Sequence, residues 1–224
     1  MRVGSLLSTF RSSATPALEE AAGAAGAGLD GVFAFDHLWP MNSPERPALA
    51  PFPVLAAVAA AHPSLAVGPL VARVSLVAPE VLVAQVETLV ALAPGRVVAA
   101  LGTGDSLSVA EEAAYGLPAM TASERRARLR DVADALRTRC EVWVGAGGAA
   151  TDALARELGV TLNFWDVSPE RLAAAALEGP VSWAGPLRDD VGARLSELSD
   201  AGSTWVVTTA TADPHELAAW ARSR

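Results

Sequence analysis

Cysteine is almost missing from this chain of 224 residues, in which Cys140 is the single one. One cysteine excludes an internal disulfide and a cysteine-based metal cluster. The three histidines, His37, His62 and His215, lack the spacing of metal ligands, so no metal site is expected. Because free cysteines are usually buried, we expect Cys140 to be a small buried thiol just before a strand.

Lysine is absent altogether. All 17 basic residues are arginines, and 25 acidic residues give the chain a net charge of −8. An acidic chain without a basic cluster argues against binding to nucleic acid or to an anionic membrane surface. The apolar run within Met1–Phe10 is too short and too polar for a secretory signal. We therefore expect a cytoplasmic protein.

Long apolar runs are scarce. One stretch, Pro47–Ala72, has no charged side chain apart from His62 and is long enough to resemble a membrane span. Its prolines break any continuous helix, so the stretch predicts a buried helix followed by a buried strand. Membrane contact is not expected.

Aromatic residues are also few, at 5%, whereas apolar residues make up 51% of the chain. Such a core is built from small side chains that allow close approaches. The length fits one compact domain, residues 1–224, at the upper end for a single hydrophobic core.

Short apolar segments alternate with helical segments along the chain. We expect strands at Arg2–Thr9, Val32–Phe35, Ala66–Val74, Arg96–Leu101, Glu141–Val144, Val160–Phe164, Val181–Trp183 and Thr204–Thr208. We expect helices from Thr15 as N-cap to Gly26–Gly28, at Pro53–Ala61, from Pro79 to Leu92, from Thr121 to Arg139, at Ala149–Leu158, from Ser168, at Asp189–Ala201 and from Asp213. Ser106–Pro118 is interpreted as a longer connection. Eight strand–helix units of about 28 residues predict an α/β fold, a minimal (βα)8 TIM barrel with short loops.

Two short motifs follow predicted strands directly. Asp36–Pro40 follows the apolar run Val32–Phe35, and Gly102–Asp105 follows Val97–Leu101. In a barrel of parallel strands, polar residues at the carboxyl ends of the strands face one shared mouth, where the chemistry takes place. The two motifs are therefore predicted to lie at one site.

These motifs resemble those of the bacterial luciferase-like family, which includes deazaflavin-dependent enzymes. The run Gly31–Trp39 carries the first part of the resemblance. The family's pattern from its third to its fourth strand is followed in order and spacing by Val67–Val71, Ala78–Leu82, Gln85–Leu89, Pro94–Val97 and Leu101–Gly104, then by Ala114–Pro118 and Glu124-Arg125. The match covers about Gly31–Arg137, and Val142–Gly148 looks like the family's phosphate-binding turn.

Within that family, Gly102–Leu107 looks most like members that use the deazaflavin coenzyme F-420. The resemblance implies that His37 and Asp36 contact the deazaflavin ring and that Trp39 packs beside the hydride-transfer face. It implies that Asp105, where those relatives carry a glutamate, manages a proton with a shorter reach. The implied catalytic residues are His37, Asp105 and Trp39, and the implied cofactor-binding residues are Asp36, His37, Val71, Ala72, Gly102, Thr103, Gly104, Gly145, Ala146, Gly147 and Gly148.

The chemistry of these residue types suits a redox cofactor. Glycines let backbone N–H groups approach a flat ring closely, and a donor such as His37 stabilises the negative charge that a reduced ring gains. A carboxylate neighbour can tune a histidine for acid–base work. The turn Gly145–Gly148 precedes a predicted helix, a common position for an anion. The structural alternatives are a hydrogen-bonded pair at Asp36-His37 and a tight turn at Gly102–Asp105, with Asp105 as N-cap.

Three functions follow from the resemblance. The first is an F-420-dependent oxidoreductase that acts on a small organic substrate. The second is an FMN-dependent monooxygenase of the same architecture. The third is a non-catalytic protein that binds flavin or deazaflavin, because little is inserted between strands and helices after Leu158, where longer relatives build a lid.

The second and third predicted helices indicate a homodimer. Pro53–Ala61 has no polar face, and Pro79–Leu92 has more apolar positions than one inward stripe requires. An apolar helix on the outside of a barrel needs a second cover, and exposed patches of this kind usually mark an interface. The alternative cover is the chain termini or the loop Pro40–Ala50.

Overall fold

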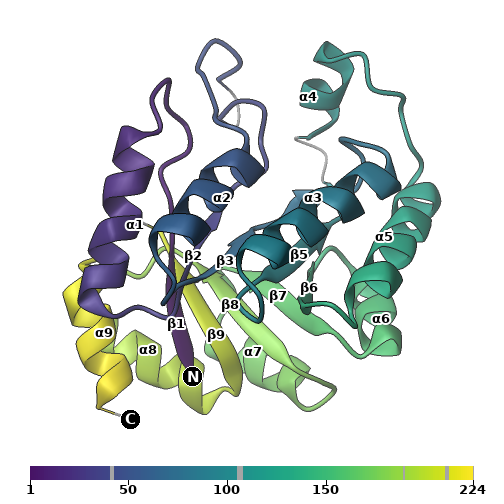
Figure 1. Ribbon diagram of the computed structural model, residues 1–224. Coiled ribbons are helices and arrows are strands. Elements are labelled where there is room, and N and C mark those ends of the chain that lie inside the picture. The colour runs from purple at the N-terminus through teal and green to yellow at the C-terminus, as the bar shows by residue number, and fades with distance from the viewer. Residues whose placement is uncertain (41–42, 105–107, 189, 210–211, 224) are drawn as a thin grey trace.

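The computed structural model describes residues 1–40, 43–104, 108–188, 190–209 and 212–223 (Figure 1). The strands in this part of the chain are β1 (Arg2–Leu6), β2 (Gly31–Ala34), β3 (Ala66–Pro69), β4 (Ala72–Arg73), β5 (Val98–Gly102), β6 (Glu141–Gly145), β7 (Thr161–Trp165), β8 (Val181–Gly185) and β9 (Ser203–Thr208). The helices are α1 (Thr15–Ala27), α2 (Pro51–Ala61), α3 (Pro79–Leu92), α4 (Ser108–Ala114), α5 (Ala122–Leu136), α6 (Ala149–Leu158), α7 (Pro169–Ala176), α8 (Val191–Asp200) and α9 (Pro214–Arg222).

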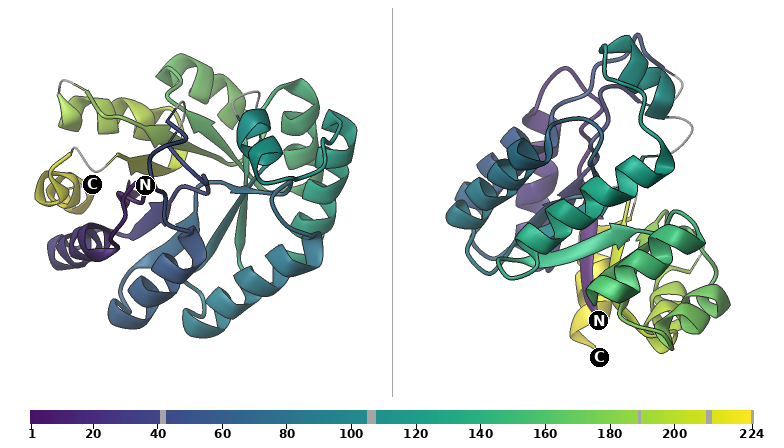
Figure 2. Two further views of the ribbon diagram at one scale, coloured as in Figure 1. Left: turned by 90° about the horizontal axis from the view of Figure 1, so that it is seen from above. Right: turned by 90° about the vertical axis from the view of Figure 1, so that its right-hand side faces the viewer.

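The strands form one parallel sheet in the order β3-β2-β1-β9-β8-β7-β6-β5-β4. Its two end strands, β3 and β4, follow one another in the chain and are separated by Leu70 and Val71. An isolated parallel bridge between Val67 and Val97 joins β3 to the segment that leads into β5. The sheet is therefore a barrel with eight strand positions, and helices surround it when it is seen from above (Figure 2).

The predicted (βα)8 fold is confirmed, with three local differences. The predicted strand Ala66–Val74 is interrupted and forms β3 and β4. The connection Ser106–Pro118 contains α4, whose alanines and glutamates are good helix formers. The prediction that Thr15 is an N-cap is wrong, because α1 begins at Thr15 itself and Ala14 occupies the cap without a side-chain hydrogen bond. The capping box of Thr121 and Glu124 is present at the start of α5.

Large aromatic rings fill the inside of the barrel. The ring centroids of Phe33, Trp143 and Trp205 lie 5.3 to 5.8 Å apart. Glycines in the strands make room for these rings: a Cβ atom on Gly4 would lie 3.1 Å from Phe33, and one on Gly31 would lie 3.1 Å from Trp205. A few aromatic rings thus pack against many small residues, as the composition predicts.

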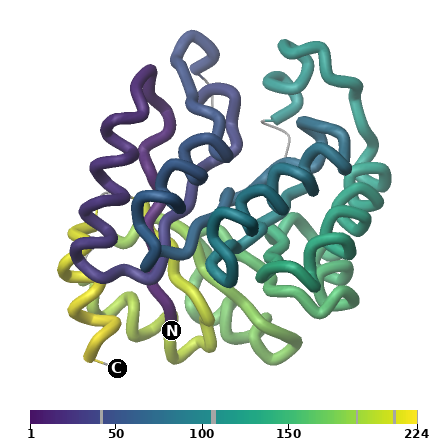
Figure 3. Tube along the Cα trace, viewed as in Figure 1, coloured from purple at the N-terminus to yellow at the C-terminus, as the bar shows by residue number. Residues whose placement is uncertain are grey.

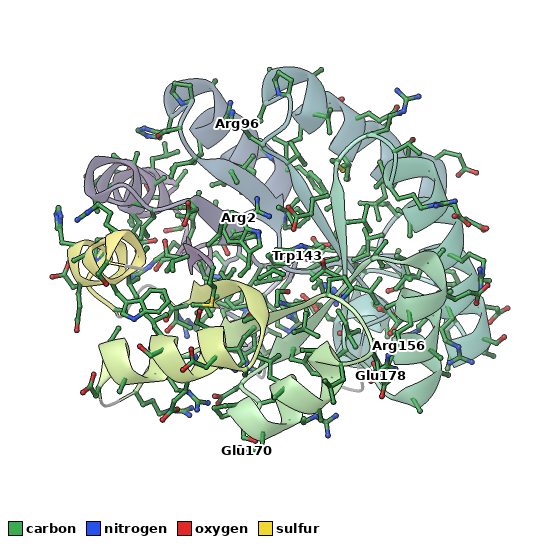
Figure 4. The ribbon with its side chains drawn as sticks, turned by 90° about the horizontal axis from the view of Figure 1, so that it is seen from below. Arg2, Arg96, Trp143, Arg156, Glu170 and Glu178 are labelled. Carbon is green, nitrogen blue, oxygen red and sulfur yellow. The ribbon has the colours of Figure 1, made fainter. Side chains whose placement is uncertain are left out.

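The lower end of the barrel is closed by a polar cluster. The Arg2 guanidinium lies 4.4 Å from the centroid of the Trp205 ring and pairs with Glu141 at 2.8 Å. The Trp143 Nε1–H donates to the same carboxylate at 2.8 Å. In the view from below, Arg2 and Trp143 lie near the centre of the barrel (Figure 4). Both described chain ends lie at this end, away from α4 (Figure 3).

The outer layer shows why α2 needs no polar face. Its inward side chains are buried, Val58 fully, and its outward positions are small residues: Pro53, Ala57, Ala60 and Ala61. On the neighbouring α3, Val81 and Leu92 are each 47% exposed. These exposed apolar side chains of α3 are available for contact with a second copy. The homodimer through α2 and α3 stays a prediction.

Cys140 lies just before β6 and is partly buried, and this burial raises the pKa of its thiol to about 11. The predicted position just before a strand is confirmed, whereas the thiol is partly rather than fully buried. Among the helices of the described residues, none combines the length and the apolar character that crossing a membrane requires.

Candidate functional site

A pocket of about 440 Å³ opens at the carboxyl ends of the strands, the upper end of the barrel in Figure 1. Residues at the ends of β2 to β7, together with one from α4, line it: Phe35, His37, Leu70, Val71, Arg73, Gly102, Thr103, Gly104, Ser108, Gly145, Ala146, Gly147, Asn163 and Trp165. Its volume is that of a small-molecule site. Parallel strands bring these distant segments together at one mouth.

Most of the predicted site residues meet in this pocket. His37, Val71, the turn Gly102–Gly104 and the run Gly145–Gly147 line it, as the strand-end motifs predict. Asp36, Trp39, Ala72 and Gly148 are not among the residues that line it. Asp105 lies outside the residues that the structure describes, so its predicted role in proton transfer stays a prediction.

His37 follows β2 and lies with its side chain 20% exposed at the edge of the pocket. Its Nδ1 is 3.2 Å from Glu111 Oε2. Its ring lies beside the stacked rings of Phe10 and Phe35, at centroid distances of 6.2 and 6.3 Å. Among the described residues, none hydrogen-bonds to the other ring nitrogen, Nε2.

Glu111 is the residue that organises the chain around His37. It lies on α4, is 2% exposed, and receives donors on both carboxylate oxygens. Oε1 accepts from the backbone N–H groups of Leu38 and Trp39. Oε2 lies beside His37 and 2.6 Å from Arg73 Nη1, an ion pair that lacks the angles of a hydrogen bond. A buried carboxylate of this kind needs such partners.

Arg73 connects Glu111 to Asp36. The Arg73 side chain is 3% exposed, its Nε–H donates to the Asp36 carbonyl at 2.9 Å, and its backbone N–H donates to Asp36 Oδ2 at 3.0 Å. Burial raises the pKa of the Asp36 carboxyl, while the hydrogen bond and the charge from Arg73 act in the opposite direction. Asp36 therefore anchors the end of β4 rather than facing the pocket.

The glycine turn after β5 has a steric reason for each glycine. A Cβ atom on Gly102 would lie 2.3 Å from Val71 Cγ2, so no larger residue fits there. Gly104 has a φ of +73°, a left-handed conformation that other residues rarely adopt. The Thr103 carbonyl accepts from Arg125 Nη1 at 3.1 Å, and Arg125 also pairs with the buried Glu112 at 3.2 Å. The turn is held firmly on the side away from the pocket.

The turn after β6 combines backbone donors with a negative charge. Gly148 is the N-cap of α6 and has a φ of +116°. The Gly147 N–H donates to Asp152 Oδ1 at 3.3 Å, and Asp152 lies in the first turn of α6. A helix start favours an anion, whereas a carboxylate at the same place opposes one. Of the predicted phosphate position Gly145–Gly148, the first three residues are open to the pocket, and the position faces one competing charge.

Trp39 packs away from the pocket. Its backbone N–H donates to Glu111 Oε1 at 3.1 Å, and its ring lies 5.8 Å from that of Tyr115, beyond the end of α4. A position at the hydride-transfer face would require the Trp39 side chain to move. Trp165, which the sequence analysis did not single out, is 49% exposed, lines the pocket and lies 5.8 Å from the Phe35 ring.

The sequence analysis missed Arg73, Glu111, Glu112 and Trp165. Arg73 had a detectable signal, since it is the first charged residue after the uncharged stretch Pro47–Ala72 and lies within a predicted strand. A lone charge in a buried strand needs a partner. Glu111 and Glu112 gave no such signal, because two glutamates among alanines are typical of an exposed helix.

The residues present fit a flat redox cofactor in their chemistry. The pocket offers apolar surface from Phe35, Val71 and Trp165, backbone from two glycine turns, and one titratable ring, that of His37. Ligand sites commonly combine a mainly apolar lining with a few polar groups in this way. Among the described residues, no three or more His, Cys, Asp or Glu side chains gather closely enough to hold a metal ion.

Comparison with known proteins gives a family match and a relative in sequence. A family model described as luciferase-like monooxygenase matches residues 1–141. The chain is 34% identical over 120 residues to an F-420-dependent glucose-6-phosphate dehydrogenase from Beutenbergia cavernae, over 53% of this chain and 34% of that enzyme. The match therefore spans about a third of that enzyme's length.

Two solved structures share the fold at low sequence identity. One is an F-420-dependent secondary alcohol dehydrogenase in complex with an F-420–acetone adduct, with a TM-score of 0.78, 12% identity and 93% of each chain covered. The other is the monooxygenase RslO1 from Streptomyces bottropensis, with a TM-score of 0.74, 13% identity, and 98% of this chain and 97% of that chain covered. At these identities the likeness shows the fold alone.

Proposed function

This chain belongs to the luciferase-like monooxygenase family, as its motifs predict, and we propose that it is an oxidoreductase that transfers a hydride between coenzyme F-420 and a small organic substrate. The observation that carries the proposal is the pocket in which His37 meets the glycine turns Gly102–Gly104 and Gly145–Gly147. The match of this chain to an F-420-dependent dehydrogenase over 120 residues supports this choice of cofactor.

The roles of the residues follow from their positions. When bound, F-420 supplies the atom that accepts or donates the hydride. His37 presents Nε2 to the pocket, where it accepts a proton as the neutral ring and, as the imidazolium, donates one to an oxygen or nitrogen that gains negative charge. The backbone of Gly102–Gly104 borders the cofactor, and Phe35 and Trp165 exclude water from one side of the pocket. Asp105 is proposed as the second proton-carrying group.

A binding experiment tests the cofactor. Purified protein is titrated with F-420 and with FMN side by side, and F-420 is expected to bind at least about tenfold more tightly, a difference of roughly 1.4 kcal/mol. FMN binding tenfold more tightly would instead support the monooxygenase, the second candidate function, which the family favours. Tight F-420 binding without hydride transfer to any carbonyl or alcohol tested would leave the non-catalytic function.

The role of His37 is tested by substitution. His37→Ala is expected to keep most of the cofactor affinity but to slow hydride transfer by about 10²-fold, the scale of a lost acid–base group. His215→Ala, on the exposed face of α9, is the matched control and should leave the rate unchanged. Equal rates in the two variants would reduce His37 to a structural residue.

We also infer that the protein acts as a homodimer through α2 and α3. The exposed Val81 and Leu92 on α3 and the small outward residues of α2 support a close apolar contact between two copies.

A further inference from the structure

Glu111 and Glu112 are adjacent on α4 and almost equally buried, at 2% and 3% exposure, yet they have different partners. Glu111 faces His37, Arg73 and the backbone that follows His37. Glu112 accepts from Ser75 Oγ at 2.5 Å and pairs with Arg125 at 3.2 Å. One glutamate therefore touches the candidate catalytic histidine, and its neighbour does not.

The contact between Glu111 and His37 has a consequence for the histidine proton. An ionised carboxylate is an acceptor only, so the nitrogen that faces it, Nδ1, must carry a hydrogen. In the neutral imidazole the proton then resides on Nδ1, and Nε2 is an acceptor directed away from Glu111. In the imidazolium, Nε2 becomes a donor while Nδ1 keeps its bond.

The surroundings of Glu111 keep this arrangement in place. Its Oε1 is already taken by the backbone N–H groups of Leu38 and Trp39, which fixes the carboxylate relative to the residue just before them. Arg73 provides a positive charge beside Oε2. The His37 ring also lies against the stacked pair of Phe10 and Phe35. Rotation of the ring would therefore break a bond to a buried charge.

We propose that Glu111 is a positioning residue that holds His37 with its proton on Nδ1 and presents Nε2 to the pocket. The role in catalysis rests on the proposed function, whereas the state of His37 can be measured without any cofactor. Glu111 acts through His37 and does not itself touch a ligand, because it does not line the pocket. It also ties α4 to the chain segment that carries His37.

The test is a ¹⁵N nuclear magnetic resonance spectrum of the histidine rings in the apo protein, at a pH at which the rings are neutral. The chain has only three histidines, so the His37→Gln spectrum identifies the His37 signals by their loss. The wild-type protein is expected to show protonated Nδ1 and unprotonated Nε2 at His37. A proton on Nε2 of His37 in the wild-type spectrum would overturn the proposal. This measurement on wild type does not depend on whether any variant folds.

Two variants separate positioning from stability. Glu111→Gln keeps the size of the side chain but can also donate, so the His37 signals should move toward a mixture of the two tautomers. Glu112→Gln, the matched control, should leave the His37 signals unchanged even if it unfolds at a lower temperature. An unchanged tautomer in Glu111→Gln, or the same change in both variants, would contradict the proposal.

Addition of F-420 to the same wild-type sample keeps this result distinct from the proposed function. If His37 has its proton on Nδ1 but its signals do not respond to F-420, the positioning of His37 stands and the proposed cofactor fails. If the signals respond to F-420 but the proton lies on Nε2, the cofactor stands and the role of Glu111 fails.

Discussion

Asp36 and Arg73 hold the ends of β2 and β4 together through two hydrogen bonds, one to the Asp36 side chain at 3.0 Å and one to its carbonyl at 2.9 Å. Because His37 follows Asp36 directly, this pair fixes the start of the segment that places the histidine at the pocket. The carboxyl group of Asp36 does this from a largely buried position, which has a consequence for the pH dependence of folding.

Asp36→Asn is expected to change how stability varies with pH. Burial raises the pKa of Asp36 above its ordinary value of 3.8, so the folded state binds this proton more tightly than the unfolded chain does. The stability from this group is therefore complete below pH 3.8 and is lost as pH rises through the folded-state pKa. Asparagine keeps the acceptor for the Arg73 N–H but does not titrate.

Urea unfolding of both proteins is measured at about pH 4 and at about pH 7.5, because the Asp36 carboxyl is expected to lose its proton between these two values. The free energy of unfolding of Asp36→Asn minus that of wild type should therefore be larger at the higher pH, because only wild type loses stability as pH rises. The same difference at both pH values would mean that Asp36 is not the group whose buried charge opposes folding.

Gly68→Ala tests how tightly the barrel is closed. A Cβ atom at this position in β3 would lie 2.0 Å from the Val98 carbonyl oxygen, and a backbone atom cannot turn away as a side chain can. The free energy of unfolding is expected to fall by about 3 kcal/mol, the upper part of the range for overpacking.

Gly23→Ala is the matched control for this substitution. Gly23 lies in α1, and nothing lies within 4 Å of the Cβ that it would gain. Alanine in a helix interior is better than glycine by about 0.5–1 kcal/mol, so this variant should be more stable than wild type. Thermal unfolding of the two variants should thus change in opposite directions, and equal losses would contradict the close approach of β3 to β5.

The regular part of this protein could be predicted from its sequence because local signals determine it. Alternating strands and helices predict the barrel, and the rule that strand ends face one mouth places His37, Gly102 and Gly145 in one pocket. The buried charge cluster could not be predicted in this way. Glu111 meets His37 across 74 positions of sequence, and only barrel closure brings α4 over the end of β2.

The turn after β6 leads to a third prediction, on cofactor binding. Asp152 in the first turn of α6 accepts from the Gly147 N–H, where the resemblance places a cofactor phosphate. Asp152→Asn keeps an acceptor for this N–H but removes the negative charge. The dissociation constant for F-420 should fall by about 3- to 10-fold, the effect of one nearby like charge in partly screened surroundings.

Salt provides a second readout of the same effect. Because salt screens charges that are exposed to solvent, the difference between Asp152→Asn and wild type should shrink as ionic strength rises. Asp131→Asn, on the exposed face of α5, removes one negative charge that makes no contact with this turn and should leave F-420 binding unchanged. Unchanged F-420 affinity in Asp152→Asn would mean that the phosphate binds elsewhere.

The proposed dimer gives the last prediction, and the structure decides which residue tests it. Val58 on α2 is fully buried within one copy, so a charge there would unfold the protein rather than separate two copies. Val81 on α3 is 47% exposed, and Val81→Glu places a charge on the apolar surface without disturbing the core. Light scattering at micromolar concentration should then give the mass of a dimer for wild type and of a monomer for this variant.

Leu177→Glu is the control, because Leu177 is 89% exposed at the end of α7, on another side of the barrel. This variant should remain a dimer with unchanged thermal stability, since a charge on an exposed side chain outside the contact costs little. High salt should not dissociate the wild-type protein, because an apolar contact does not depend on charge screening. A wild-type mass of 23.0 kDa, that of a single chain, would exclude the dimer through α2 and α3 at this concentration.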